Sequence, residues 1–80
     1  MPVTTSADSC SAIMLSTAAI TVHHDAGIVE IVTPGPASPH GVSDSDWLAV
    51  CKLLKRLDAH IESEPLYQES TDTDLWTATF

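Results

Sequence analysis

Residues 43–63 read SDSDWLAVCKLLKRLDAHIES, and they carry the clearest helical pattern of this chain. Apolar side chains recur there at steps of three and four residues, which places them on one face of a helix and leaves most charged residues on the other. Leu53 falls at the border of that face. The pattern predicts an amphipathic helix whose apolar face is Trp47, Val50, Cys51, Leu54, Leu57 and Ile61.

Local signals give the two ends of this helix. Ser43 and Asp46 have a spacing like that of a capping box, and Ser45 is a rival cap. Acidic residues in the first turn are favoured by the helix dipole. Pro65 disfavours helical geometry at the residue before it, so we expect the helix to end near Ser63.

Two strands are predicted before the helix. Residues 10–24 are rich in Ile, Val, Thr and Ala, and their even-numbered positions are apolar except for Ser16, which is the period of a half-buried strand. Ser16 and Thr17 also mark a bulge or a break, so two shorter strands are an alternative. Residues 24–27, HDAG, predict a hairpin turn, and residues 28–33 return as a strand with Glu30 at solvent or at an edge. The Pro- and Gly-rich residues 33–41 predict a loop.

After the helix, residues 66–69 predict a short strand, residues 70–74 a turn and residues 75–80 a strand. The expected fold class is therefore α+β: an antiparallel sheet of about four strands, in the order β-β-α-β-β, with one helix packed on one face. We expect a flexible N-terminus at residues 1–9 and a single domain at residues 10–80. The predicted core is Met14, Ala18, Ile20, Val22, Val29, Ile31, Val50, Leu54, Leu57, Ile61, Trp76 and Phe80.

Composition excludes several classes of protein. The chain has 80 residues, with 11 acidic and 3 basic side chains, a net charge of −8 and 44% hydrophobic residues. It is too apolar for a disordered acidic tail and too acidic for a conventional nucleic-acid-binding module. The same charge argues against binding to an anionic membrane surface. It has no apolar run long enough for a transmembrane helix, and its start lacks the basic region of a signal peptide. We therefore expect a cytoplasmic protein.

Residue types that carry chemistry are present without the spacing that would make a site. Cys10 and Cys51 form no C-x-x-C pair, so we expect inert thiols, with Cys10 the more exposed and the better placed to cross-link two chains. The histidines also lack the spacing of a zinc site, and the neighbours His23 and His24 point to opposite faces of a strand. No nucleophile elbow and no Gly-rich phosphate loop occur, so we expect no enzyme, metal or cofactor. A metal- or thiol-dependent protein that uses the two cysteines and the histidines His23, His24, His40 and His60 is the competing hypothesis.

Charge layout is the most informative feature of the sequence. All three cations, Lys52, Lys55 and Arg56, lie in the helix, whereas five carboxylates follow it. We interpret these carboxylates as a patch that binds a basic partner, with a solvated surface that serves only solubility as the alternative. Leu48 falls among Lys52, Lys55 and Ala59 on the polar side of the helix, where it is either a scattered surface residue or an anchor for a partner or a second copy. The predicted partner-binding residues are Glu62, Glu64, Glu69, Asp72, Asp74 and Leu48.

This short, acidic, Ala/Ser/Thr-rich chain with a few strands and one helix resembles the small anti-CRISPR proteins encoded by phages and mobile elements, in particular those directed at type I (Cascade) systems. The resemblance lies in size, charge and layout over the whole chain, so no functional residue is carried over. It implies a non-enzymatic inhibitor that acts in a bacterial host and binds a Cascade surface that would otherwise hold DNA or recruit the nuclease. The same charge fits an antitoxin, an immunity protein or a small structural adaptor. A homodimer is also expected, because a small domain gains stability by burying surface against a second copy.

Overall fold

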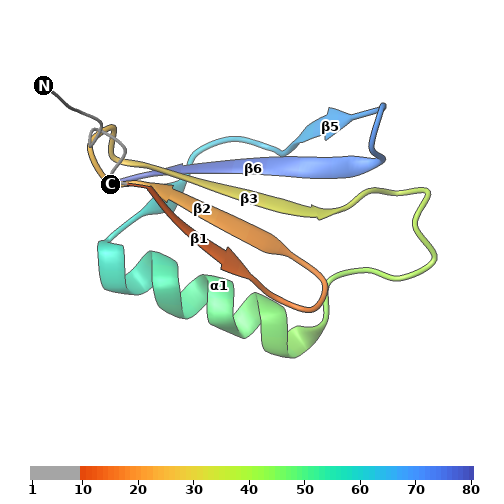
Figure 1. The fold of residues 1–80 in the computed structure, drawn as a ribbon, viewed down its shortest axis with the longest axis horizontal. Coiled ribbons are helices and arrows are strands. Elements are labelled where there is room, and N and C mark those ends of the chain that lie inside the picture. Colours follow the sequence, from red (N-terminus) through yellow and green to blue (C-terminus); the bar gives the residue numbers. More distant parts are fainter. Residues whose placement is uncertain (1–9) are drawn as a thin grey trace, which may run out of the picture.

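The predicted helix and antiparallel sheet are both present in the computed structural model, which describes residues 10–80 (Figure 1). The expectation about residues 1–9 lies outside the described part. The helix α1 (Asp44–Leu57) packs on one face of a sheet of six strands, two more than the four expected. The strands are β1 (Cys10–Met14), β2 (Ala19–His23), β3 (Ile28–Pro34), β4 (His60–Ile61), β5 (Leu66–Gln68) and β6 (Thr73–Thr79).

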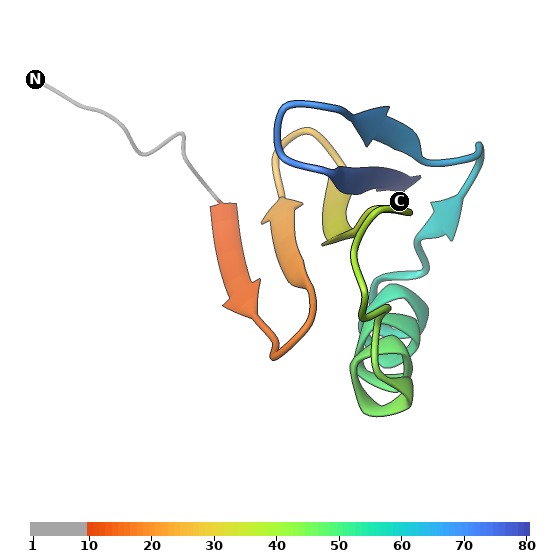
Figure 2. The same cartoon turned by 90° about the vertical axis from the view of Figure 1, so that its right-hand side faces the viewer.

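The strands run in the order β1-β2-β3-β6-β4, and every pair is antiparallel. β3 pairs with β6 along its whole length, so β4 and β5 share the other edge of β6. β4 lies opposite the C-terminal end of β6 and β5 opposite its N-terminal end. Figure 2 shows the helix beneath the sheet, with β1 at one edge and β4 at the other.

The single strand predicted for residues 10–24 is in fact two strands, which was the alternative reading. A turn at residues 15–18, closed by the Leu15 N–H donating to the Ala18 carbonyl at 2.8 Å, reverses the chain. Met14 then pairs with Ala19, so even-numbered residues of β1 share a face with odd-numbered residues of β2. Met14 therefore lies on the face away from α1 and is 79% exposed, and its assignment to the core was wrong.

The Asp46 carboxylate holds this turn against the start of the helix. It accepts hydrogen bonds from the Thr17 N–H (2.6 Å), the Thr17 hydroxyl and the Ser16 hydroxyl (3.2 Å). The Thr17 hydroxyl oxygen also accepts from the Ser43 N–H at 3.1 Å, and the Ser43 hydroxyl accepts from the Asp46 N–H at 3.2 Å. The hydrogen bonds from the Thr17 side chain and backbone are the main causes that lower the pKa of Asp46, while burial opposes them.

The helix begins after its Ser43 cap as predicted, but it ends at Leu57 rather than near Ser63. Asp58 adopts a left-handed conformation (φ 58°), and its N–H and that of Ala59 bond the last helical carbonyls. Ala59 is then buried, and Ile61 lies on β4, where it pairs with Ala78 of β6. Ile61 was therefore wrongly placed on the helix and in the core, since it is 36% exposed.

The core lies between α1 and the face of β2, β3 and β6 that it covers. The predicted members Ala18, Ile20, Val22, Val29, Ile31 and Val50 are buried, and Leu54, Leu57 and Trp76 pack partly buried against them. Ala59 and Ala78 belong to the core as well. The Trp47 and Trp76 rings meet edge to face at 5.7 Å, which joins the helix to β6. Phe80 was predicted in the core but follows the last strand and is 44% exposed.

Candidate functional site

Five predicted carboxylates lie along the edge of the sheet that β4 and β5 form. Two follow β4, two lie at the β5–β6 turn and one is on β6 itself. Three of them are exposed, and Asp72 and Asp74 are half-buried. We call this set the acidic edge: Glu62, Glu64, Glu69, Asp72 and Asp74.

Members of the acidic edge differ in what holds them. The Asp72 carboxylate accepts a hydrogen bond from the Tyr67 hydroxyl at 2.8 Å and another from the Ala37 N–H at 3.4 Å. This hydrogen bond to Asp72 is the main cause of the raised pKa of Tyr67. A Cβ on Gly35 would lie 2.8 Å from the Asp72 carbonyl oxygen, so only glycine fits beside this turn. Asp72 is thus a structural member of the edge, while no side-chain hydrogen bond engages Glu64 or Glu69 within residues 10–80.

The charge of the acidic edge is not neutralised within the described chain. The two ion pairs among residues 10–80 both involve histidine, His23 with Glu30 and His60 with Asp58. The lysines and the arginine of α1 form none with a carboxylate of this part. The protein therefore carries its positive charges on the helix and a free negative edge on the sheet.

Leu48 has only part of the surroundings that were predicted for it. Lys52 and Lys55 lie on α1 with it, but Ala59 does not. Leu48 is 56% exposed and lines a shallow apolar groove of about 470 Å³ between α1 and β4, together with Trp47, Cys51 and Ile61. Because Glu62 follows Ile61, the groove and the acidic edge meet at β4. Glu62 itself accepts a hydrogen bond from the Thr79 hydroxyl at 2.7 Å, whereas Glu69 and Asp72 lie at the other end of the edge.

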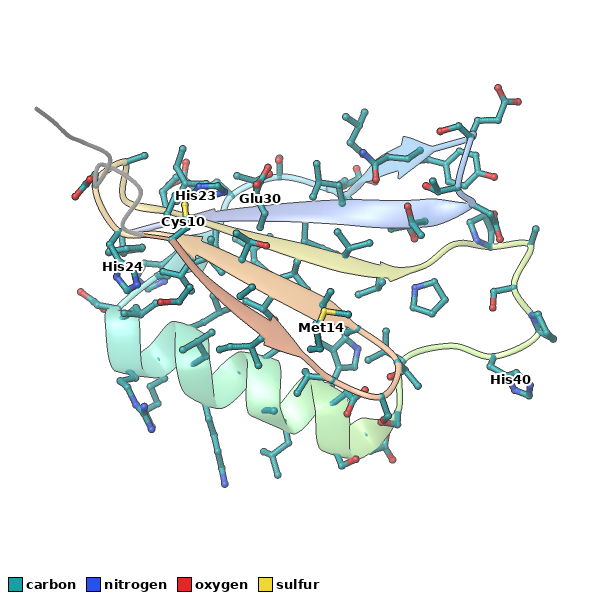
Figure 3. The ribbon with its side chains drawn as sticks, viewed as in Figure 1. Cys10, Met14, His23, His24, Glu30 and His40 are labelled. Carbon is teal, nitrogen blue, oxygen red and sulfur yellow. The ribbon has the colours of Figure 1, made fainter. Side chains whose placement is uncertain are left out.

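A second cluster of side chains, around Cys10 and His23, was not predicted from the sequence. Cys10 lies directly opposite His23 in the β1–β2 pairing, and its Sγ is 3.2 Å from His23 Nδ1 (Figure 3). The other ring nitrogen, Nε2, is 2.7 Å from Oε1 of Glu30 on β3. His24 bonds a different partner, the Ser11 hydroxyl, at 3.0 Å. A break at Ser16 and Thr17 was the signal that would have placed Cys10 opposite His23.

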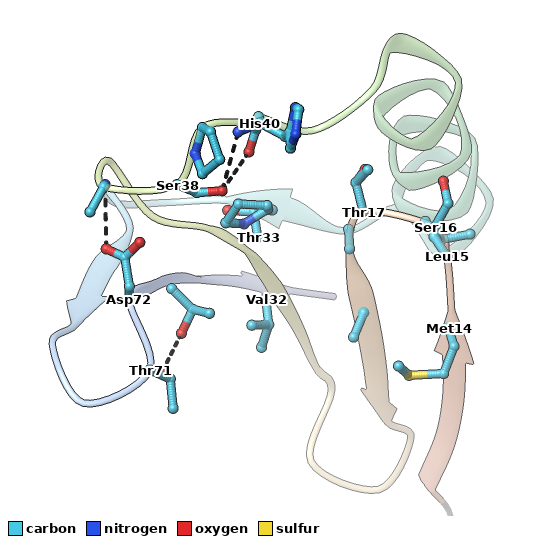
Figure 4. Close-up of a pocket in the computed structure, with 17 residues that line it drawn as sticks. Met14, Leu15, Ser16, Thr17, Val32, Thr33, Ser38, His40, Thr71 and Asp72 are labelled. Carbon is cyan, nitrogen blue, oxygen red and sulfur yellow. Dashed lines mark hydrogen bonds between the residues drawn. The ribbon is translucent and has the colours of Figure 1, made fainter.

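A wide hollow of about 830 Å³ lies beside the loop that joins β3 to α1 (Figure 4). Its lining includes the β1–β2 turn, the end of β3 and the β5–β6 turn. His40 and Asp72 are its titratable residues, and the Asp72 carboxylate is already bound by Tyr67. Within residues 10–80, no group of three or more His, Cys, Asp or Glu side chains is placed to hold a metal ion.

Comparisons with protein-family models, with curated proteins and with solved structures gave no match for this chain. The only helix of residues 10–80, α1, is too short and too polar to cross a membrane.

Proposed function

We propose that this protein is a small, non-catalytic inhibitor that binds a basic, nucleic-acid-binding surface of a protein complex in the cytoplasm of a bacterial host. An anti-CRISPR protein directed against a type I Cascade effector is the form of this proposal that the resemblance favours. CRISPR effector complexes hold nucleic acid in positively charged channels, and a body with a net charge of −8 is attracted to such channels. The observation that carries the proposal is the acidic edge, which no lysine or arginine of residues 10–80 neutralises.

The groove at Leu48 supplies the apolar part of the proposed interface. Protein interfaces combine a few apolar anchors with a polar rim, and the rim charges guide the approach of the partner. Leu48 and Ile61 line an apolar floor, and Glu62 and Glu64 come directly after β4 in the chain. An anchor beside a negative rim is a suitable arrangement for a basic protein surface.

The direct test measures binding of labelled target DNA by a purified type I effector complex in the presence of this protein. We expect the protein to reduce DNA binding, and we expect rising salt to weaken this inhibition because exposed charges are screened over about 8–10 Å at ordinary ionic strength. The double variant Glu62→Lys/Glu64→Lys should inhibit less, mainly through a slower on-rate, while Leu48→Ala should dissociate faster.

The single variants Asp25→Lys and Glu64→Lys reverse one carboxylate each, so Asp25→Lys is the matched control for Glu64→Lys. Asp25 is exposed like Glu64 but lies in the β2–β3 turn, outside the acidic edge. Asp25→Lys should keep most of the inhibition. Inhibition by the Glu62→Lys/Glu64→Lys variant equal to wild type at low salt would mean that the acidic edge serves only solubility, as in the adaptor or antitoxin alternative. An effector complex that binds DNA unchanged would exclude this partner.

The expected homodimer is also a proposal, and β1 supplies its contact. β1 pairs with β2 on one side only within residues 10–80, and all five of its residues are exposed. We propose that two copies pair through this open edge. Sedimentation at high micromolar concentration, with reductant present, should show a dimer, and Met14→Lys should shift it towards monomer. A dimer that reductant removes would be a thiol cross-link instead, and monomer at every concentration would exclude the pairing.

A further inference from the structure

Cys10, His23 and Glu30 form a line of three chemically complementary side chains on the face of the sheet that α1 leaves open. They come from three neighbouring strands, β1, β2 and β3. The thiol and the carboxylate contact opposite nitrogens of the same imidazole ring, at 3.2 Å and 2.7 Å. A nucleophile, a base and a group that orients the base are therefore in hydrogen-bond contact.

The contacts assign the tautomer of His23. A carboxylate accepts hydrogen bonds, so the Nε2–H donates one to Oε1 of Glu30. When the ring is neutral, Nδ1 is the nitrogen without a proton, and it accepts the S–H of Cys10. The side chains of His23 and Glu30 are 34% and 40% exposed, which shelters their contact in part from water. Cys10 itself is exposed on the open edge strand, so a reagent can reach its sulfur.

The second cysteine has none of these features. Cys51 is also free and exposed, but it lies on α1 beside Lys52 and has no histidine contact within residues 10–80. The chain thus contains two accessible thiols, of which one has a positioned base. Because both thiols are free and exposed, a faster reaction at Cys10 than at Cys51 would be attributed to the histidine beside Cys10.

We propose that Cys10 is a site of thiol–disulfide exchange with a low-molecular-weight disulfide of the cellular thiol pool, with His23 as its base and Glu30 as the positioning residue. The Cys10 thiol gives its proton to His23 Nδ1, and the thiolate attacks one sulfur of the disulfide. A new sulfur–sulfur bond forms to Cys10 as the original one breaks. The departing thiolate takes the proton from His23, which leaves a mixed disulfide on Cys10 and one free thiol. This inference is independent of the proposed partner.

The test uses single-thiol variants and dipyridyl disulfide, whose product is followed by absorbance. The probe is uncharged, which removes the attraction that Lys52 and Lys55 would exert on an anionic reagent near Cys51. At neutral pH, Cys51→Ser, which retains Cys10, should react about tenfold faster than Cys10→Ser, which retains Cys51. Adding His23→Gln to Cys51→Ser should lower the rate to near that of Cys51, and adding Glu30→Gln should lower it less.

His24→Gln in the same background is the matched control, because His24 is the neighbouring histidine and contacts Ser11 rather than Cys10. It should leave the Cys10 rate unchanged, and circular dichroism should show the same fold for all variants. Glutathione disulfide should then modify wild type at Cys10 by mass spectrometry. Equal rates for the two thiols, an equal loss in His23→Gln and His24→Gln, or modification at Cys51 alone would overturn the proposal.

Discussion

At the scale of single residues, Thr17 replaces half of the expected capping box. In a full box the side chain of the third helical residue accepts a hydrogen bond from the backbone N–H of the cap. Here the Thr17 hydroxyl accepts that hydrogen bond from the Ser43 N–H, and it donates one to the Asp46 carboxylate. The Asp46 carboxylate is thereby free to bind the turn at Ser16 and Thr17. One buried charge thus fixes both the start of the helix and the reversal between β1 and β2.

We expect Asp46→Asn to lower the midpoint of thermal unfolding at neutral pH by several degrees, because an amide accepts these donors less strongly and also brings N–H groups that lack acceptors. The folded state lowers the pKa of Asp46, so this contribution to stability is present above the pKa of the unfolded chain and is lost as pH falls through the folded pKa. The difference between wild type and Asp46→Asn should therefore be smaller at a pH well below 3.8, the ordinary pKa of an aspartate, than at neutral pH. Thermal scans at both pH values measure it, and a pH-independent difference would contradict the assignment.

How much of the candidate site the sequence could reveal depends on the range of the contacts involved. The cap at Ser43 and the turn at residues 24–27 are local and were predicted correctly. The pairing of Cys10 with His23 requires the turn at residues 15–18, which Asp46 holds from a distant part of the chain. The sequence marked a break there but could not select it over one long strand, so the cluster at Cys10 was missed.

At the scale of elements, the end of α1 shows the same limit. Residues 58–63 fit the helical pattern or its margin but lie outside α1. Asp58 adopts the left-handed conformation that ends the helix, and His60 and Ile61 pair with β6. Pro65 is a local signal, and it sets only the last position that the helix could reach; the helix ends earlier, at Leu57. The pairing partner lies in the last strand, which no local pattern of residues 58–63 reveals.

Asp58→Gly should stabilise the protein by about 1 kcal/mol, because glycine adopts positive φ without the steric cost that a Cβ brings. The change also removes a negative charge from the negative end of the helix dipole. Denaturant unfolding measures the gain. Asp58→Ala is the control, since it removes the same charge but keeps a Cβ, and it should not stabilise as much. Equal gains in both variants would show that charge rather than conformation limits this cap.

At the scale of the whole molecule, the core is thin. Its largest fully buried side chains are Ile31, Val22, Val29 and Val50, and α1 supplies only the last of these. Much of the remaining packing comes from half-buried leucines and the two tryptophans. A domain of this size has only a few kcal/mol of net stability, so a single truncation on the helix consumes much of it.

Leu54→Ala should therefore cost about 2 kcal/mol, the lower end of the range for such truncations because Leu54 is only half-buried, and leave a measurable unfolded fraction on warming. Leu48→Ala makes the same chemical change at a position of α1 that is 56% exposed, and it should alter stability by less than about 0.5 kcal/mol. Chemical denaturation of both variants makes the comparison. Similar costs for the two leucines would show that the helix packs through a different face.

The place of β6 inside the sheet has a consequence for how the protein is made. β6 is the last of the six strands in sequence, yet it lies between β3 on one side and β4 and β5 on the other. Its residue Thr79 pairs with Ile28 of β3. As the ribosome releases the chain, β1, β2 and β3 can form a meander early, but β4 and β5 have no strand to pair with until residues 73–79 emerge. The apolar face of α1 then has only part of its sheet to cover. Pairing of β4 and β5, and with it completion of the sheet, therefore waits until the long connection from β3 to β6 has closed.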